Sequence, residues 1–377
     1  MKNDYIYLDY SATTPVNEDV LNTFCEVSKS YVGNPNSLHL LGLEAKKLMD
    51  AATSQVAELL GVKSKEVIFT SGASEANNLA IVGVLEKYKN RGKHIITTKL
   101  EHSSILECVS YLEKNGYIID YVDVLEDGSI DINHLKSLLT KETILVSIHH
   151  VNSEVGIKQN VSEMGKILKD YPTTIFHVDG TQAVGKIPVD LSNIDLYTFS
   201  GHKFFGLKGI GCLIKKENIE LEPMIHGGKS QTIYRSGTPP VALIVSISKA
   251  LRLAIKDLEK KYNYVLSLNK ILIEELNKID GVVVNSLDNC IPHIVNISVI
   301  GIKPETMLHA LEEEKIFIST KTACSKDNSD SLTLTTMGRD TTISGHSIRI
   351  SISYLTTEKE IHTFVEKLKL CIKKLKF

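Results

Sequence analysis

The sequence predicts an α/β protein with a large domain, built on a mostly parallel sheet flanked by helices, and a smaller α+β domain. Short apolar runs rich in β-branched residues alternate with helical patterns over the first two thirds of the chain. Strands that are apolar throughout are buried on both faces, which is typical of a parallel sheet. With 377 residues, 42% of them hydrophobic, the chain is long and apolar enough for a sizeable core.

The strands and helices of the large domain follow one another along the chain. The predicted pairs are strand 66–72 with helix 74–88, strand 93–103 with helix 104–115, and strand 143–156 with helix 160–171, followed by strands within 174–185 and 194–203. Residues 239–279 then read as one long amphipathic helix, kinked or bent, that leaves the first domain. We therefore expect a large domain over 15–255 and a small domain formed by 1–14 together with 256–377.

Charge and cysteine usage exclude several classes of protein. The formal net charge is -2, which does not indicate a nucleic-acid surface. The six cysteines form no C-x-x-C pair and have no histidine at metal-finger spacing, so they fit reduced thiols in a cytoplasm. The N-terminus lacks the apolar core of a signal peptide, and no stretch approaches a membrane span. We expect a cytoplasmic protein without membrane contact, whose basic C-terminal helix is solvated.

Polar and ionisable residues follow each predicted strand of the large domain. They are Ser71 to Glu75 after the first strand, Glu101 and His102 after the second, Asn152 and Glu154 after the third, Asp179, Gly180 and Gln182 after the fourth, and Ser200, His202 and Lys203 after the fifth. Ligands of such sheets bind beyond the carboxyl ends of the strands. The five strand ends therefore predict one polar rim, although Lys203 alone would read as a solvated loop charge.

The residue types on this rim match what pyridoxal phosphate requires. An amine forms an imine with its aldehyde, and a carboxylate keeps its pyridine nitrogen protonated. A helix N-terminus with small residues binds its phosphate, and an imidazole stacks on its ring. The candidates are Lys203, Asp179, the 72–74 turn and His102. Taken singly, Asp179 also fits a helix cap and His102 a core histidine, so only the set indicates the cofactor.

Eight ordered motifs carry a family resemblance over nearly the whole chain. They are YLDYSATTPV, GNPNSLH, FTSGASEANNLAI, LEHSSIL, HHVNSEVG, HVDGTQAVGK, FSGHKFFGLKGIG and YRSGTP. Together they resemble the cysteine desulfurases among the class-V, fold-type I pyridoxal-phosphate enzymes. The resemblance implies a seven-stranded type of sheet and the conversion of L-cysteine to L-alanine. It also implies a homodimer and a sulfur-acceptor protein, such as an iron–sulfur scaffold or a tRNA-thiolation enzyme.

The resemblance also implies a role for each matching residue. Lys203 would carry the cofactor as an internal aldimine, Asp179 would pair with the pyridine nitrogen, and His102 would stack on the ring and move protons. The other implied contacts are Ala73, Ser74, Ser200 and His202 at the phosphate, Gln182 at the phenolic oxygen, Asn152 at the ring or the substrate, Thr238 at the phosphate of the other subunit's cofactor, and Arg349 with Asn34 at the substrate carboxylate. Singly, Asn152 also fits a turn residue and Arg349 a surface charge on a strand.

A desulfurase needs a cysteine that attacks the substrate sulfur, and Cys324 stands where the family keeps it. It lies in a polar loop after a small-domain strand, whose composition is typical of exposed segments. The chain departs from the family here, because STKTAC places Lys321 where a glycine is usual. Lys229 likewise replaces a third glycine of the stretch before RSGT, and Tyr10–Ser11 replaces Asn–Ala. An ammonium three residues from Cys324 predicts a lowered pKa for this thiol.

Other functions fit parts of the same pattern. Without a catalytic role for Cys324, the chain fits a selenocysteine lyase or another class-V lyase or aminotransferase, because one scaffold serves several reactions. The altered loops also fit a cofactor-bound partner protein with little turnover. A nicotinamide enzyme fits poorly, since Gly206, Gly209 and Gly211 follow the order G-x-x-G-x-G rather than G-x-G-x-x-G.

Overall fold

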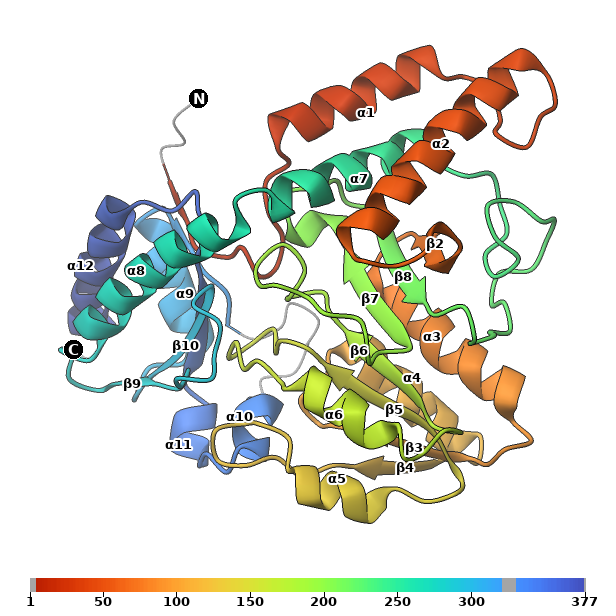
Figure 1. Ribbon diagram of the computed structural model, residues 1–377. Coiled ribbons are helices and arrows are strands. Elements are labelled where there is room, and N and C mark those ends of the chain that lie inside the picture. The colour runs from red at the N-terminus through yellow and green to blue at the C-terminus, as the bar shows by residue number, and fades with distance from the viewer. Residues whose placement is uncertain (1–4, 321–329, 376–377) are drawn as a thin grey trace.

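The computed structural model describes residues 5–320 and 330–375. Its centre is a seven-stranded sheet with the order β2-β8-β7-β6-β5-β3-β4 (Figure 1). The strands are β2 (Val67–Thr70), β3 (His94–Thr97), β4 (Ile118–Tyr121), β5 (Thr143–His149), β6 (Ile175–Asp179), β7 (Leu196–Ser200) and β8 (Gly211–Lys215). Strand β8 is antiparallel to both neighbours, and the other neighbouring strands are parallel. The predicted mostly parallel sheet is confirmed.

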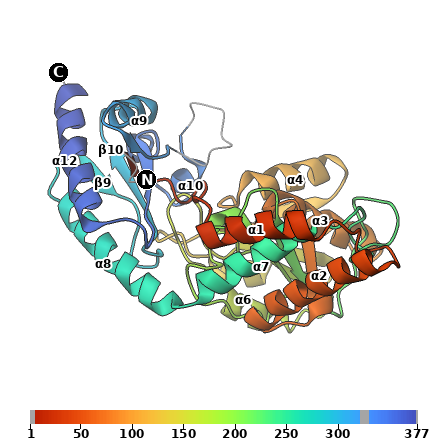
Figure 2. The same ribbon diagram turned by 90° about the horizontal axis from the view of Figure 1, so that it is seen from above.

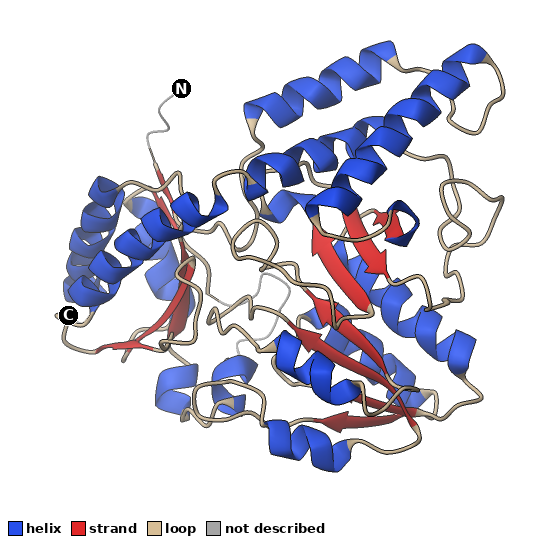
Figure 3. Ribbon diagram, viewed as in Figure 1, coloured by secondary structure: helices blue, strands red, loops and turns tan. Residues whose placement is uncertain are grey.

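Helices cover both faces of this sheet, as Figure 3 shows with the helices in blue. One face packs against α1 (Glu18–Ser30), α2 (Leu40–Leu59), α5 (Ile132–Leu138), α6 (Val161–Leu168) and α7 (Val241–Ile255), and the other against α3 (Ala73–Tyr88) and α4 (Ser103–Lys114). Successive strand residues point to opposite faces. Phe69 therefore lies in the first core and its neighbour Ile68 in the second, which is why the strands read as uninterrupted apolar runs.

The helix expected over 239–279 is two helices in the structure. Helix α7 ends at Ile255, and α8 (Leu258–Leu276) begins after Asp257, whose φ of 57° is left-handed. Aspartate tolerates this conformation better than most residues, so it ends the first helix and redirects the chain. Figure 2 shows α8 leaving the large sheet toward the C-terminal part of the chain.

A second region packs on a core of its own. Its sheet has the order β12 (Ser347–Ser351), β10 (Ile294–Val299) and β9 (Val282–Val284), all antiparallel, and β1 (Ile6–Tyr7) pairs in parallel with β11 (Ile316–Phe317). Its helices are α8, α9 (Pro304–Glu313) and α12 (Glu358–Leu375), with the short α10 (Leu332–Thr336) and α11 (Thr341–Ser344) nearby. Leu8 belongs to this core. The domain division near residue 255 stays a prediction, which the separate cores support.

Candidate active site

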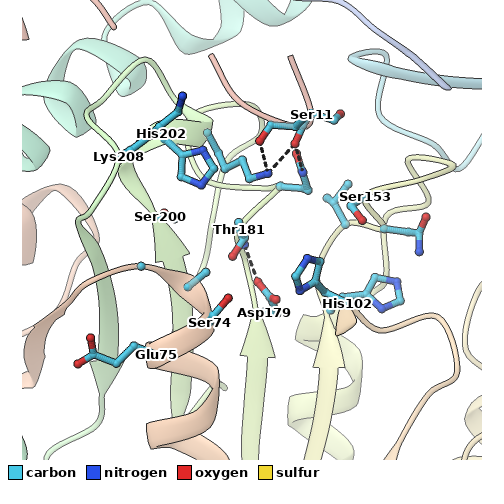
Figure 4. A pocket seen from close by; sticks show the side chains of 18 of the residues that line it. Ser11, Ser74, Glu75, His102, Ser153, Asp179, Thr181, Ser200, His202 and Lys208 are labelled. Carbon is cyan, nitrogen blue, oxygen red and sulfur yellow. Dashed lines mark hydrogen bonds between the residues drawn. The ribbon is translucent and has the colours of Figure 1, made fainter. Parts of the chain in front are cut away.

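A polar recess lies at the carboxyl ends of the strands of the large sheet (Figure 4). It is a cavity of about 460 Å³, a size that accommodates a small-molecule ligand. Among the predicted site residues, those that line it are Ala73, Ser74, His102, Asn152, Asp179, Gln182, Ser200, His202, Lys203 and Arg349. The fold thus brings residues from positions 73 to 349 around one space.

The N-terminus of α3 opens onto this cavity. Its N-cap Gly72 offers no side chain to the first N–H groups of the helix, and Ala73, Ser74 and Glu75 all line the cavity. Free N–H groups and the helix dipole make such a terminus an anion site. A Cβ on Gly211 would lie 2.6 Å from the backbone of Gly72, so a glycine at 211 is what lets β8 approach this turn.

Lys203 reaches the cavity from the short 3₁₀ turn Gly201–Lys203 that follows β7. Its Nζ donates to the carbonyl oxygens of Ser11 at 2.7 Å and Ala12 at 2.8 Å. Both carbonyls belong to the N-terminal segment, in which Ser11 and Ala12 line the cavity. These two neutral carbonyl oxygens hold the amine of Lys203 in the cavity.

Asp179 ends β6 and is held in one orientation. Its Oδ1 accepts the backbone N–H of Thr181 at 2.9 Å, and its Oδ2 accepts the amide Nδ2 of Asn77 at 2.9 Å. Asn77 is fully buried in α3 and donates also to Ser104 Oγ at 3.0 Å. The carboxylate is thereby fixed by two donors from different elements, as a group that must face a ligand atom needs to be.

His102 caps α4, and its tautomer follows from its contacts. Its Nδ1 accepts the backbone N–H of Ser104 at 3.1 Å, so in the neutral ring the proton sits on Nε2. Burial lowers the pKa of His102 below its usual value. The neutral ring therefore presents an N–H donor on the side away from the helix.

His202 and Ser200 complete the wall near the N-terminus of α3. Burial, together with the charge of Lys203, lowers the pKa of His202 to about 4. The ring is neutral at pH 7, and its Nδ1 lies 3.1 Å from Thr13 Oγ1. Both residues line the cavity and supply neutral polar groups there.

Arg349 is the contribution of the second region. It lies on β12, is 2% exposed, and donates to Asp9 Oδ1 at 2.8 Å and to the Ser153 carbonyl at 2.9 Å. Within the described part of the chain, its Nε has no hydrogen-bond partner. The interpretation of Arg349 as a surface charge is therefore wrong, because the side chain is buried and its charge is paired with Asp9.

The amides of Asn152 and Gln182 are largely engaged by the protein. Asn152 accepts the N–H groups of Glu154 and Val155 and donates to the Leu100 carbonyl, so it is a turn residue as well as a wall of the cavity. Gln182 donates to the Ser11 carbonyl at 2.9 Å. Each amide retains one N–H for a ligand, so their assigned roles stay predictions.

Two predicted site residues lie elsewhere. Asn34 and Thr238 together line a second cavity, between the end of α1 and the start of α7. Cys324 lies outside the described residues. Glu101 and Glu154 were also expected on the polar rim, but neither lines the cavity. Instead, the carboxylate of Glu101 accepts a hydrogen bond from His149, and that of Glu154 accepts one from Ser331.

The sequence reasoning missed four cavity or supporting residues. Ser11, Asn77 and Thr181 sit inside quoted motifs, but their roles depend on contacts across the fold. His149 also lines the cavity, with its Nδ1 2.8 Å from Glu101 Oε1. The feature of the sequence that could have indicated His149 is its position at the end of a strand. In the structure it is in register with Asp179 on the neighbouring strand.

The chain resembles known proteins over nearly its whole length. The model of the aminotransferase class-V family matches residues 6–364. The cysteine desulfurase IscS of Buchnera aphidicola is 40% identical over 365 residues, covering 94% of this chain and 90% of its own. That of Dictyoglomus turgidum is 38% identical over 376 residues, covering 98% and 95%.

Solved structures also resemble this chain over nearly its whole length. A NifS-like protein superposes with a TM-score of 0.93 at 33% identity, covering 98% of this chain and all of its own. SspA in complex with cysteine superposes with a TM-score of 0.82 at 30% identity, covering 92% and 99%. The fold and site define a class-V aminotransferase-type enzyme. Within that class, the chain belongs to the cysteine desulfurase family.

The described residues fit pyridoxal phosphate, the cofactor of this family. The cavity offers an amine, a carboxylate and an uncapped helix N-terminus, which match the aldehyde, the pyridine nitrogen and the phosphate. Several cavity-lining residues also carry buried polar atoms that no other described residue hydrogen-bonds. These are Ser11 Oγ, His149 Nε2, Thr181 Oγ1 and Arg349 Nε. Buried polar atoms normally have partners, so a polar ligand completes this site.

Proposed function

We propose that the chain, a pyridoxal-phosphate-dependent cysteine desulfurase, transfers the sulfur of L-cysteine to Cys324 as a persulfide. In this reaction the Cβ–S bond of cysteine breaks, a sulfur–sulfur bond forms on Cys324, and L-alanine leaves. The electrons and protons balance, because one thiol and L-cysteine become one persulfide and L-alanine. The observation that carries the proposal is the convergence of Lys203, Asp179 and Arg349 on one cavity beside a helix N-terminus.

Each group of the chain has a defined task in this proposal. When bound, pyridoxal phosphate supplies an electron sink for the substrate's Cα. Asp179 holds the pyridine nitrogen protonated, and the N-terminus of α3 with Ser200 and His202 binds the phosphate. Gln182 donates to the phenolic oxygen, and Asn152 orients the ring or the substrate.

Substrate binding and proton transfer fall to the remaining cavity groups. Arg349 binds the substrate carboxylate, for which its partnerless Nε–H is available. The amine of Lys203 would serve as the general base that takes the proton at the substrate's Cα. The Nε2–H of neutral His102 would be the group that hydrogen-bonds the substrate thiol, because its Nδ1 already accepts from Ser104.

We also propose that the protein is a homodimer with sites at the subunit interface. Asn34 and Thr238 do not line this cavity of their own chain but a second one. Large apolar side chains are exposed in the segments around them, including Leu38 at 91%, Val32 at 75% and Ile233 at 60%. Such exposure is typical of a surface that a second subunit covers, which would bring Thr238 to the partner's phosphate.

The acceptor of the sulfur would be a protein that reaches Cys324, such as an iron–sulfur scaffold or a tRNA-thiolation enzyme. The names of the relatives support sulfur transfer as the common activity.

The cysteines of the described residues are free thiols, namely Cys25, Cys108, Cys212, Cys290 and Cys371. This thiol state supports the proposal of a reducing cytoplasm. No helix in the described part of the chain could cross a membrane.

The test uses the purified holoprotein, wild type and Cys324→Ala. We expect both proteins to show the visible band of the lysine-linked cofactor. With L-cysteine and a reductant, wild type should release sulfide and L-alanine in equal amounts, and the variant neither. Cys25→Ala, which changes another thiol, serves as the matched control and should keep full activity. Sulfide release that survives in Cys324→Ala would refute the role of this cysteine.

A further inference from the structure

Lys186 is a buried lysine that the proposed reaction does not use. It is 7% exposed, and its Nζ donates to the amide Oε1 of Gln182 at 2.5 Å. Among the residues that the structure describes, no carboxylate lies within ion-pair distance of it. A buried ammonium without a counter-ion is costly, so the position calls for an explanation.

The local fold directs Lys186 toward Gln182. One helical turn follows β6, in which Ala183 N–H bonds to the Gly180 carbonyl and Lys186 N–H to the Ala183 carbonyl. Lys186 follows Gln182 by four residues in this turn, and its Nζ reaches the amide oxygen of Gln182. Gly185 has a φ of 76°, and a Cβ there would lie 2.8 Å from Phe204 Cβ. The turn is thus packed tightly behind the cavity.

This contact decides which end of the Gln182 amide faces the ligand. Its oxygen is taken by Lys186, so its nitrogen must be the end that reaches the Ser11 carbonyl and the cavity. The same Ser11 carbonyl accepts from Lys203. A hydrogen-bonded chain therefore runs from Lys186 through Gln182 and Ser11 to the amine that binds the cofactor.

We propose that Lys186 is a positioning residue that holds Gln182 with its N–H toward the phenolic oxygen of the bound cofactor. The inference rests on the cofactor role of the site given above. An N–H donor stabilises the negative phenolic oxygen, which then holds the neighbouring proton on the Lys203–cofactor nitrogen less tightly. Lys186 thereby lowers the pH at which that nitrogen loses its proton. Burial and the nearby charges of Lys203 and Arg349 lower the pKa of Lys186.

The test is a pH titration of the visible absorption of the holoprotein without substrate. In Lys186→Met the Gln182 amide loses the partner of its oxygen, and we expect the midpoint to rise by about 1 pH unit. Lys186→Arg keeps a donor and should restore the wild-type midpoint. Lys166→Met removes a charge from the exposed face of α6 and is the matched control. A midpoint in Lys186→Met equal to that of the control overturns the proposal.

A double-mutant cycle separates action through Gln182 from a direct charge effect. Gln182→Leu alone should raise the midpoint as Lys186→Met does, which also keeps the test open if Lys186→Met does not fold. In the Gln182→Leu background, Lys186→Met should add little. An equal further shift would show that Lys186 does not act through Gln182. These readouts need only the bound cofactor, so failure of wild type to release sulfide would refute the proposed function and not this inference.

Discussion

The large sheet and the second region build the cavity in different ways. The large sheet supplies Asp179, Lys203 and their neighbours from strand ends, where parallel pairing fixes the backbone. The second region supplies Arg349 from β12, held by Asp9 and by the Ser153 carbonyl of the other region. The cofactor groups are therefore set by one sheet, whereas the position of Arg349 depends on how the two regions pack.

The largest expected effect comes from removing Lys203 from the large sheet. In Lys203→Ala the cofactor has no amine to which it can attach. We expect loss of the visible lysine-linked band and a fall in desulfurase activity on the order of 10³-fold or more. Lys208→Ala, five residues further along the same wall, is the comparison variant and should keep the band. Retention of the band in Lys203→Ala would refute the assignment.

A smaller and different effect is expected for Arg349 in the second region. Arg349→Lys keeps a charge but loses the planar fork that suits a carboxylate. We expect kcat/KM for L-cysteine to fall about 10- to 150-fold, the range of a lost charged hydrogen bond. The band of the bound cofactor should be unchanged, because Arg349 belongs to the other region. Altered cofactor binding with an unchanged KM would contradict the separation of roles.

Acid should weaken the large sheet through its buried histidines. Burial lowers the pKa of His177 from 6.5 to about 4, with its ring between Ser147 and Thr198. The unfolded chain takes up a proton below about pH 6.5, and the folded chain does so only near pH 4. The stability contribution is thus complete above pH 6.5 and is lost as the pH falls toward 4.

Urea unfolding of His177→Gln from pH 7 to 4 measures this effect. The slope of unfolding free energy against pH should be smaller than in wild type by about 1.4 kcal/mol per pH unit, the value for one proton. The control is His309→Gln, whose histidine is exposed in the second region. Identical slopes for wild type and His177→Gln would show that this histidine does not cause the acid sensitivity.

The smallest expected effect concerns Lys321 and the thiol of Cys324. Alkylation of Cys324 against pH should show a midpoint higher by less than about 1 unit in Lys321→Ala, because the ammonium favours the thiolate. Lys321→Arg keeps the charge and should match wild type. Equal midpoints for wild type and Lys321→Ala would show that Lys321, which replaces the usual glycine, does not lower the pKa of Cys324.

Much of the cofactor site could be predicted because its residues stand in contiguous motifs. The runs HVDGTQAVGK and FSGHKFFGLKGIG place Asp179 and Lys203 directly after strands, so strand order alone puts them on one rim. Strand order could not predict which of Glu101 and His149 lines the cavity. Both follow or end strands, yet one turns inward to bond the other, and no spacing in the sequence distinguishes the two outcomes.

The sequence by itself determined the fold class and the family, and it predicted residues that line the cavity, since apolar strands and local turns are encoded within short segments. Only the tertiary structure decided the contacts between distant segments. Asn77 on Asp179, Ser11 on Lys203 and Asp9 on Arg349 each join residues about a hundred or more positions apart. Such hydrogen bonds depend on the packing of whole elements, to an accuracy of a few tenths of an ångström that no local pattern specifies.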